Sequence, residues 1–361
     1  MVDIINDMDS LQYIQSNHTP EEKKASLDLV RESYGEHVDI AYEKYYDWQY
    51  LENPFGKGNI ILAYEGGQAI AQLASVPCMY KIQSSSVPVS LIMNLCVSPR
   101  YQQKGMSVQL MSGLINRIQR INEPSILAVV MPNNTAIKVF VRHKFYSMPM
   151  KLLIRPTKLS KLFHNPAPRM LLRPFDYIWK KGKSTCVQEY PTIFDTRFDD
   201  FDIEIGLEND IRHVRDSKFL NWRYKNNPRR KYKVFTQMGK DGKLNGYIVV
   251  RITEALRTCT GFIMDFVVRR GNIDCGRDLV QCALEYFWSN DTTLAVVACI
   301  SKSVEYSLLK KAGFLTCPDR FRPHPLTICV KNLKEEQMKG RDNKLLDPSM
   351  WFFMFGDYET F

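Results

Sequence analysis

The sequence predicts an α/β protein made of two mixed-sheet domains related by tandem duplication. The first observation is a repeated heptapeptide: "WQYLENP" at Trp48–Pro54 returns as "WRYKNNP" at Trp222–Pro228. The second is that each copy is followed by the same order of strand-like and helix-like segments. The third is the offset between matching positions, 174 residues at the tryptophans and 169 between Phe145 and Phe314. A register kept over about 100 residues indicates a duplicated domain rather than a copied peptide.

The sequence patterns of the two halves predict the same order of elements: a hairpin of two strands, a third strand, a helix, a buried strand and a second helix. β-rich runs predict the strands, and apolar residues spaced by three and four predict the helices. In the first half the hairpin turns at Gly66-Gly67, a dipeptide suited to tight turns. The elements predicted in the first half are 60–64, 69–80, 89–97, 107–122, 125–132 and 133–145. Their counterparts in the second half are 232–237, 244–253, 261–268, 278–288, 293–300 and 302–314.

The chain is predicted to divide into a first domain at 1–155, a connector at 156–190, a second domain at 191–335 and a tail at 336–361. The connector is rich in proline and basic residues but also holds Phe175, Tyr177 and Trp179. This composition predicts a packed segment with a short helix rather than a flexible linker. The tail, "DPSMWFFMFGDYETF", is too aromatic to remain in water, and we expect it to dock on the body of the protein.

The composition is that of a globular protein with a basic surface. The chain has 49 Lys and Arg against 39 Asp and Glu, and its net charge of +10 favours anionic partners. The densest basic run, "RRKYK" at 229–233, is too short to indicate nucleic-acid binding. An acidic N-terminus and the lack of an apolar run of about 18 residues predict a cytoplasmic protein without membrane insertion. Nine cysteines without CxxC spacing predict reduced thiols and no metal site.

The stretch "CVSPRYQQKGMSVQLM" is the one that carries chemistry, because it joins a strand to a helix through a glycine-containing loop. The first N–H groups of a helix lack partners and lie at the positive end of its dipole, an arrangement that captures anions. Gly105 lets the backbone approach a ligand, small Ser107 leaves the helix start uncrowded, and Lys104 adds charge at the rim. We therefore expect residues 103–107 to hold a pyrophosphate, with an ordinary strand-to-helix turn as the alternative.

This stretch resembles the acyl-CoA motif of the GNAT superfamily of N-acyltransferases, V-x-P-x-[YW]-[RQ]-x-x-G-x-[GAS]. Its defined positions are taken by Val97, Pro99, Tyr101, Gln102, Gly105 and Ser107. Downstream, where the family often shows Asn, a small residue, Tyr and Gly-Phe, the chain has Asn133, Ala136, Phe140 and Lys144-Phe145. The resemblance covers about 60–150 and implies two GNAT-like domains. The order of motifs is also similar to tandem-domain GNAT proteins that modify sugars in bacterial surface-polysaccharide pathways.

The resemblance implies that acetyl-CoA or another acyl-CoA is the co-substrate. It also implies a set of CoA-binding residues on the strand end, the loop, the helix start and the downstream helix. These residues are Leu95, Cys96, Val97, Gln102, Gln103, Lys104, Gly105, Met106, Ser107, Asn133 and Phe140. For Cys96, a buried thiol is the preferred interpretation over a nucleophile.

Two departures from the family concern the catalytic groups. Phe140 stands where many members keep a tyrosine that protonates the leaving thiolate, although a thiol of pKa ~8.5–9.5 can leave with water as its acid. The strand that often carries a glutamate base has Asn94 instead, three residues before Val97. Its counterpart in the second half is Asp265, so Asn94 and Asp265 are the candidate catalytic residues. The alternative for Asp265 is a structural pairing at the domain interface.

The second half is predicted to be a degenerate copy that does not bind CoA. Its loop reads "VVRRGNIDCGRDLV", without the glycine spacing of the first loop, and Asp274 and Asp278 would repel phosphate. Its expected use is structural, to complete the packing of the sheets and to form one wall of the acceptor cleft.

The expected activity is acyl-CoA-dependent N-acyl transfer, in which a neutral primary amine attacks the thioester directly. A backbone N–H near Val97 is expected to stabilise the oxyanion, and the acceptor to lie between the halves. The positive charge suits an anionic small-molecule or glycan acceptor, such as a nucleotide-linked amino sugar. Two alternatives remain: an aminoacyl-tRNA-dependent transferase of the peptidoglycan-bridge type, which does not need the CoA loop, and a non-catalytic CoA-binding or scaffold protein.

Overall fold

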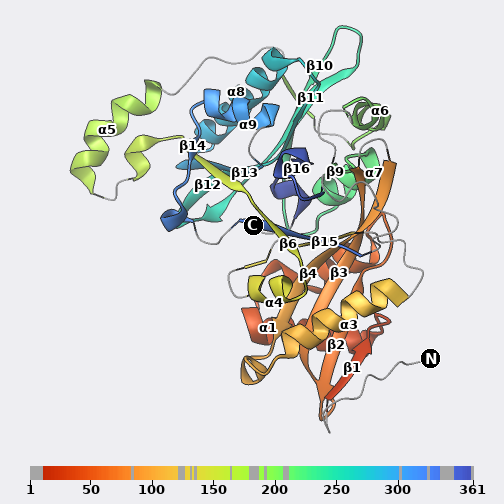
Figure 1. Cartoon of the computed structure of the whole chain (residues 1–361). Helices are drawn as coiled ribbons and strands as arrows, with labels where there is room; N and C mark the ends of the chain where they lie inside the picture. Colours follow the sequence, from red (N-terminus) through yellow and green to blue (C-terminus); the bar gives the residue numbers. More distant parts are fainter. Residues whose placement is uncertain are drawn as a thin grey trace.

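The computed structural model describes most of the chain. The described residues are 11–82, 85–120, 127–130, 132–133, 136–162, 165–178, 187–190, 193–205, 211–300, 303–322, 326–333 and 345–358. They form two mixed sheets, each with helices packed on it, and the two lobes lie one above the other in Figure 1. The predicted α/β fold with two mixed sheets is confirmed.

The first sheet has the strand order β1-β2-β3-β4-β5-β15-β6, with β9 paired to β3 and β16 paired to β9. Its strands are β1 (Leu11–Gln15), β2 (Asn59–Glu65), β3 (Gln68–Ile82), β4 (Ser85–Val97), β5 (Leu127–Val130), β6 (Tyr146–Pro149), β9 (Ile211–His213), β15 (Thr327–Asn332) and β16 (Trp351–Phe352). The helices α1 (Pro20–Tyr34) and α3 (Met106–Arg120) pack on it, and a short helix α4 (Ile137–Arg142) follows β5.

The second sheet has the order β14-β7-β13-β12-β11-β10-β8. Its strands are β7 (Lys151–Pro156), β8 (Gln188–Glu189), β10 (Lys233–Met238), β11 (Leu244–Ala255), β12 (Thr258–Val268), β13 (Leu294–Cys299) and β14 (Leu315–Thr316). The remaining helices are α2 (Glu43–Tyr46), α5 (Pro166–Ile178), α6 (Thr196–Glu204), α7 (Ser217–Leu220), α8 (Ile273–Ser289) and α9 (Val304–Lys311). Of these, α8 packs on β10, β11 and β12, as α3 packs on β2, β3 and β4 in the first half.

The two sheets exchange one strand each. The strand β7, which follows the first half in sequence, pairs antiparallel with β13 and β14 of the second sheet. The strand β15, near the end of the second half, pairs antiparallel with β5 and β6 of the first sheet. The predicted boundaries at 155 and 335 divide the chain in sequence, but each sheet also contains one strand that the other half supplies. A fragment ending at residue 155 would leave β5 and β6 without the strand between them.

The repeated heptapeptides form the contact between the two halves. Each lies on one π-helical turn, η2 (Asp47–Leu51) or η5 (Asn221–Lys225). The indole N–H of Trp48 donates to the carbonyl oxygen of Trp222 at 2.8 Å, and the indole N–H of Trp222 donates to that of Trp48 at 2.8 Å. Their rings stack at 4.6 Å with an angle of 14°. Such a reciprocal contact is what two copies related by a local two-fold axis make.

The aromatic tail docks between the halves, as expected from its composition. Trp351, Phe352 and Phe353 are buried, and β16 pairs parallel with β9. The ring of Phe355 packs against Phe262 of β12 with centroids 5.8 Å apart. The tail is therefore part of both the first sheet's edge and the core of the second half.

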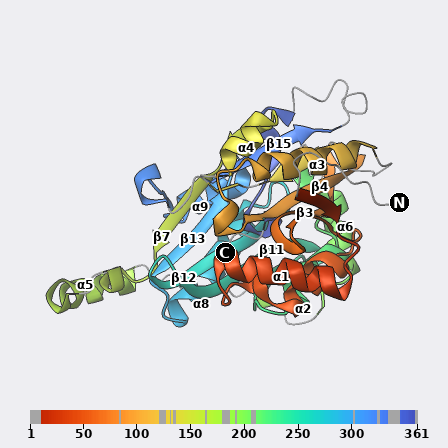
Figure 2. The ribbon, with the colours of Figure 1, turned by 90° about the horizontal axis from the view of Figure 1, so that it is seen from below.

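The connector departs from the prediction of a packed segment. It does contain a helix, α5, but this helix packs mainly against the short helix η4 (Leu159–Leu162) and stands away from the body in both views (Figures 1 and 2). Met170 and Leu171 are 78% and 75% exposed. The side chains of Phe175 and Tyr177, and all of Trp179, lie outside the described residues. The packing of these three aromatic residues stays a prediction.

Candidate active site

An open cleft of about 520 Å³ lies where the predicted CoA loop leaves the end of β4. Nine of the predicted CoA-binding residues line it: Leu95, Cys96, Val97, Gln102, Gln103, Gly105, Met106, Ser107 and Asn133. The same cleft is lined by residues of α1 and α4 that the sequence did not single out, among them Tyr34 and Arg142. The loop, the helix start and the downstream asparagine therefore converge on one cavity, although they are separate in the sequence.

The loop has the backbone conformation of an anion site. Gln103 and Gly105 have positive φ angles, 66° and 81°, which turn the chain sharply before α3 begins at Met106. The N–H of Val108 already donates to the carbonyl oxygen of Gly105 at 3.0 Å. The N–H groups of Met106 and Ser107 precede this first helical bond and are the ones a ligand can use. A side chain on Gly105 would meet no protein atom within 4 Å, so the space above it is open.

Lys104 and Phe140 do not take the predicted places in the cleft. The ammonium of Lys104 lies over the ring of Tyr101, 4.8 Å from its centroid, and does not line the cavity. Phe140 is buried and packs edge-on against Phe145 at 5.2 Å. Its position in α4 suits a core residue, because the side chain points under the helix rather than into the cleft. Phe140 is therefore corrected from a CoA contact to a packing residue.

The strand β4 carries a bulge at Asn94. The pairing with β3 runs from Val97↔Ala71 and Cys96↔Gln72 to Met93↔Ala74, so Asn94 and Leu95 together oppose Leu73. Asn94 has φ 52°, a left-handed conformation that bulges commonly use. A bulge re-aims the side chains that follow it, which turns the end of β4 toward the cleft.

In the described residues, the pairing of β4 with β5 ends before this bulge. Their parallel pairing covers only Val89–Leu91 of β4 in the described residues. The N–H of Ser98 donates to the carbonyl oxygen of Ile70 at 2.8 Å, so the neighbouring pair Val97↔Ala71 is of the non-hydrogen-bonded kind. The N–H of Val97 therefore points away from β3, into the gap that opens beside β4. A polar donor is thus aimed at the place where the cleft meets the sheet.

Asn94 is held by two hydrogen bonds from its amide nitrogen. Nδ2 donates to Oε1 of Gln49 at 2.9 Å and to the hydroxyl of Tyr50 at 2.6 Å. Asn94 does not line the cleft itself, but it links the end of β4 to the heptapeptide turn. An amide is too weak a base to take a proton from an amine. The Asn94 side chain can therefore hold neighbouring groups in position but cannot act as a proton acceptor.

Asp265 occupies a structural site, which corrects the expectation that it could be a base. It is fully buried, and Arg215 donates Nε–H to its carboxylate at 3.0 Å. The Arg215 guanidinium also donates to both oxygens of Asp357 in the tail, at 2.8 and 2.7 Å. Burial, with the neighbouring Asp357 charge, raises the pKa of Asp265 against the pull of Arg215. Asp265 lines neither the open cleft nor the second cavity described below. The alternative of a structural ion pair therefore holds.

Tyr34 is the most informative residue that the sequence did not reveal. It lies at the end of α1, lines the cleft, and its hydroxyl donates to the carbonyl oxygen of Leu95 at 2.9 Å. Burial and the nearby Cys96 thiol raise the pKa of Tyr34, so the phenol is protonated at neutral pH. Burial raises the pKa of Cys96 to about 12, which makes its thiol a poor nucleophile. No local motif marks Tyr34, because α1 is 60 residues from the loop in the chain.

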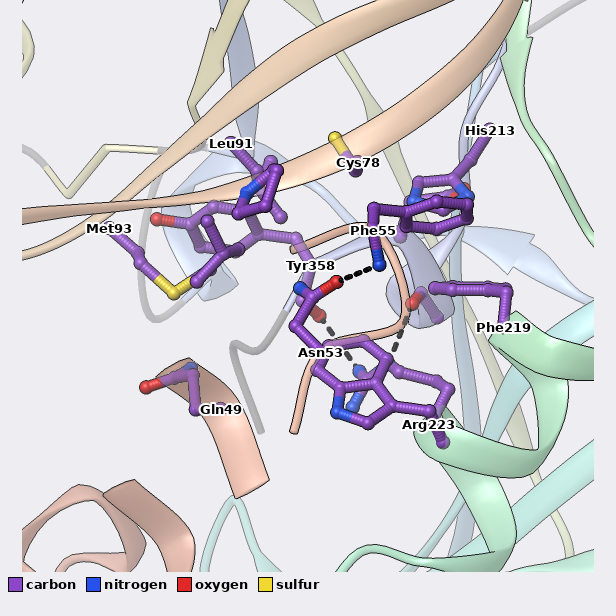
Figure 3. Close-up of a pocket in the computed structure, with 15 residues that line it drawn as sticks. Gln49, Asn53, Phe55, Cys78, Leu91, Met93, His213, Phe219, Arg223 and Tyr358 are labelled. Atoms are coloured by element: carbon purple, nitrogen blue, oxygen red, sulfur yellow. Dashed lines mark hydrogen bonds between the residues drawn. The ribbon is translucent and has the colours of Figure 1, made fainter. Parts of the chain in front are cut away.

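A second, closed cavity of about 20 Å³ lies on the other side of β4, between the halves (Figure 3). It is lined by Leu91 and Met93 of β4, by residues of β3, by His213 of β9 and Phe219 of α7, and by the heptapeptide turns and the tail. A volume of this size holds one water-sized group. Gln49 lines this cavity and accepts the hydrogen bond from Asn94, so Asn94 lies between the two cavities.

The polar groups of the closed cavity are neutral or already paired. Burial lowers the pKa of His213 to about 3, and its Nδ1 lies 2.6 Å from the carbonyl oxygen of Val214. Nδ1 therefore carries the proton, which leaves Nε2 as a hydrogen-bond acceptor. The Asp357 carboxylate is occupied by Arg215, and the Tyr358 hydroxyl donates to the carbonyl oxygen of Ile92 at 3.1 Å. Nothing in the sequence around His213 distinguished it.

The start of the corresponding helix in the second half, α8, is capped by a side chain of the protein itself. The side chain of Asn272 accepts from the N–H of Cys275 at 3.1 Å and so caps α8 internally. Gly276 is a packing glycine, because a side chain there would meet Leu308 at 2.4 Å. These contacts pack the first turn of α8 within the protein.

The comparisons with known proteins agree with this geometry. Residues 16–138 match the model of the acetyltransferase (GNAT) domain. No curated protein matches the chain in sequence. The match covers β4, the loop, α3 and the start of α4, which are the elements that form the cleft. Residues 16–138 therefore form a GNAT acetyltransferase domain, and this match supports an N-acyltransferase that uses an acyl-CoA as co-substrate.

Solved structures show the same fold over nearly the whole chain. A probable N-acyltransferase of Enterococcus faecalis aligns with a TM-score of 0.61 and 13% identity, over 89% of this chain and 72% of the other. A GCN5-related N-acetyltransferase of Anabaena variabilis aligns at 0.61 and 11%, over 89% and 73%. The N-myristoyltransferase of Saccharomyces cerevisiae, solved with bound myristoyl-CoA, aligns at 0.59 and 12%, over 91% and 83%. At these identities the likeness concerns the fold.

Two further features concern the described residues alone. None of the helices there is both long and apolar enough to cross a bilayer. Within the same residues, no three His, Cys, Asp or Glu side chains gather as metal ligands would.

Proposed function

We propose that the protein transfers the acyl group of an acyl-CoA to a primary amine that enters from the opposite side of β4. The observation that carries this proposal is the placement of two cavities on either side of the Asn94 bulge. The open cleft, with its loop and helix start, suits CoA, and the closed cavity has room for an amino group. A myristoyl-CoA complex of a protein with the same fold supports a CoA donor in the cleft.

The closed cavity favours an uncharged amine. Its lining is mainly apolar and includes the guanidinium of Arg223, while His213 is neutral. Burial beside a cation disfavours an ammonium group, so the amine binds as the free base that can attack a carbonyl. His213 Nε2 accepts a hydrogen bond from this amine and orients it. With a pKa of about 3, His213 is too weak a base to remove its proton.

The gap beside β4 places the thioester between the two cavities. The N–H of Val97 points into this gap and stabilises the oxyanion that forms when the amine adds to the carbonyl carbon. Asn94 keeps the bulge, and with it Val97, in register through Gln49 and Tyr50. The C–S bond then breaks, and the proton that the nitrogen loses balances the one that the CoA thiolate gains.

We propose that the Tyr34 hydroxyl donates a hydrogen bond to the leaving thiolate, while water supplies the proton, because the raised pKa of the phenol makes it a weaker acid than the thiol. We expect Tyr34→Phe to lower kcat about 10- to 100-fold while the Kd for acyl-CoA stays within about twofold, because the phenol acts on the leaving group. Tyr146→Phe, an exposed tyrosine of β6, serves as the control and should leave kcat unchanged. An unaltered kcat in Tyr34→Phe would remove this assignment.

The acceptor is proposed to be a small anionic amine, such as a nucleotide-linked or glycan amino sugar. The net charge of +10 supports this class. The experiment is to mix the protein with acetyl-CoA or longer acyl-CoAs and a panel of amino sugars and simple amines, and to follow free CoA thiol. We expect CoA release that depends on the amine, with an N-acylated product by mass spectrometry.

The two rival functions predict different results in this assay. A non-catalytic CoA-binding protein would bind acyl-CoA without releasing thiol for any amine. An aminoacyl-tRNA-dependent transferase would show neither CoA binding nor thiol release. The open loop at Gly105 supports the CoA-dependent function over the second rival.

A further inference from the structure

The helix α5 presents an apolar face to solvent instead of to the protein. It is fixed on its polar side, where Asp176 accepts from the N–H of Ser160 at 3.0 Å and from its hydroxyl at 2.5 Å. Met170 and Leu171 lie on the far side, 78% and 75% exposed, with Ala167 and Pro174 exposed beside them. Helices of globular proteins bury such a face, so this one is built to contact something else.

The helix is anchored to the second half of the protein. Its support, η4, is held by Lys158, whose ammonium lies 2.6 Å from Asp291 and 4.7 Å from the centroid of the Trp288 ring. Lys161 pairs with the same aspartate. Because α5 is bound to η4 and η4 to this lobe, α5 projects from the body as a defined arm (Figures 1 and 2).

The charge around α5 identifies the occupant. Among the described residues, Lys158, Lys161, Arg169 and Arg173 outnumber Asp176 and Asp291, the aspartate that pairs with the two lysines, so the arm has a net positive charge. Arg169 and Arg173 of α5 are exposed. A second copy of the chain would bring the same positive charge to the contact and be repelled. An anionic lipid surface instead accepts the apolar side chains and attracts the basic ones.

We propose that α5 is an interfacial anchor that docks the protein on anionic lipid surfaces. At ~1.5 Å per residue its 13 residues are about 20 Å long, which suits a helix lying in the plane of the headgroups. Met170 and Leu171 enter the acyl boundary, and the arginines remain at the level of the phosphates. The proposal is independent of the acyl-transfer function, since α5 contributes no residue to either cavity.

The test is co-sedimentation of the full chain with vesicles of phosphatidylcholine alone or with 30% phosphatidylserine (roughly physiological content). We expect binding to the anionic vesicles only, weakened by raising the salt from 0.1 to ~0.5 M. Met170→Gln with Leu171→Gln should reduce binding at least about tenfold, since two apolar side chains are lost from the contact. The matched control is Ile203→Gln, an exposed isoleucine of α6, which should bind as the wild type does.

Two results would overturn the proposal. The first is the absence of binding to anionic vesicles, or binding that the double variant leaves intact. The second is a wild-type dimer in sedimentation velocity that Met170→Gln with Leu171→Gln converts to a monomer, which would assign the face to a second copy. Both replaced side chains are exposed, so the melting temperature of the variant should match that of the wild type and exclude misfolding.

Discussion

Gly105→Asp abolishes acyl-CoA binding and leaves the protein folded. A Cβ atom added at Gly105 has no protein atom within 4 Å, so the new carboxylate would occupy the open space above the loop. It would therefore exclude the ligand and would not clash with the protein. It also places a negative charge beside the N–H groups of Met106 and Ser107, which we expect to bind the pyrophosphate. We expect the Kd for acyl-CoA to rise at least about 100-fold, measured by calorimetric titration.

The matched control for this variant is Gly271→Asp. Gly271 has φ 74°, close to the 81° of Gly105, stands before α8 as Gly105 stands before α3, and also has no neighbour within 4 Å. The backbone strain of the two variants is therefore similar, about 1 kcal/mol. The control should share the small loss of melting temperature and retain full acyl-CoA affinity. An unchanged Kd in Gly105→Asp would show that CoA does not use this loop.

The parts of the site that could be predicted from the sequence are those that lie on one continuous segment. The strand, loop and helix from Leu95 to Ser107 are local in the chain, so their pattern alone indicated the cleft. Tyr34 and Arg142 reach the same cleft from other helices, and no spacing rule connects them to the loop. Contacts of this kind depend on tertiary packing, which local patterns do not contain.

The repeat predicted two matching halves but not how they join. The repeat placed Asn94 and Asp265 at matching sequence positions, yet Asn94 lies beside the site and Asp265 lies in the core. The difference comes from Arg215 and Asp357, which enclose Asp265 and come from segments without a counterpart in the repeat. The exchange of β7 and β15 could not be predicted either, because the apolar pattern of a strand does not indicate in which sheet the strand pairs.

Arg215→Met is expected to lower the free energy of unfolding by about 3–5 kcal/mol, because it leaves two buried carboxylates without their common cation. Arg215, Asp265 and Asp357 are each 3% exposed or less. Urea unfolding measures the loss. Lys243→Met is the control: its ion pair with Glu204 lies at the surface, at 2.9 Å, and should contribute under about 1 kcal/mol.

The pH dependence separates this electrostatic cause from a packing defect. Burial already raises the pKa of Asp265 in the folded protein, and without the guanidinium it lies further above its value in the unfolded chain, about 3.9. Folding then takes up protons, so the deficit of Arg215→Met should shrink as the pH falls from about 7 to 5. Adding Asp265→Asn and Asp357→Asn should recover part of the stability at pH 7. A deficit that stays constant with pH would contradict the electrostatic explanation.

The Arg215→Met variant also tests whether the tail forms one wall of the acceptor cavity. Asp357 precedes Tyr358, which lines the closed cavity and donates to the carbonyl oxygen of Ile92 beside the β4 bulge. Releasing Asp357 from Arg215 loosens this wall but leaves the CoA loop untouched. At a temperature where the variant is still folded, we therefore expect KM for the amine to rise and the Kd for acyl-CoA to stay within about twofold. Equal losses for amine and acyl-CoA would mean that the tail supports the fold as a whole and does not shape the acceptor cavity.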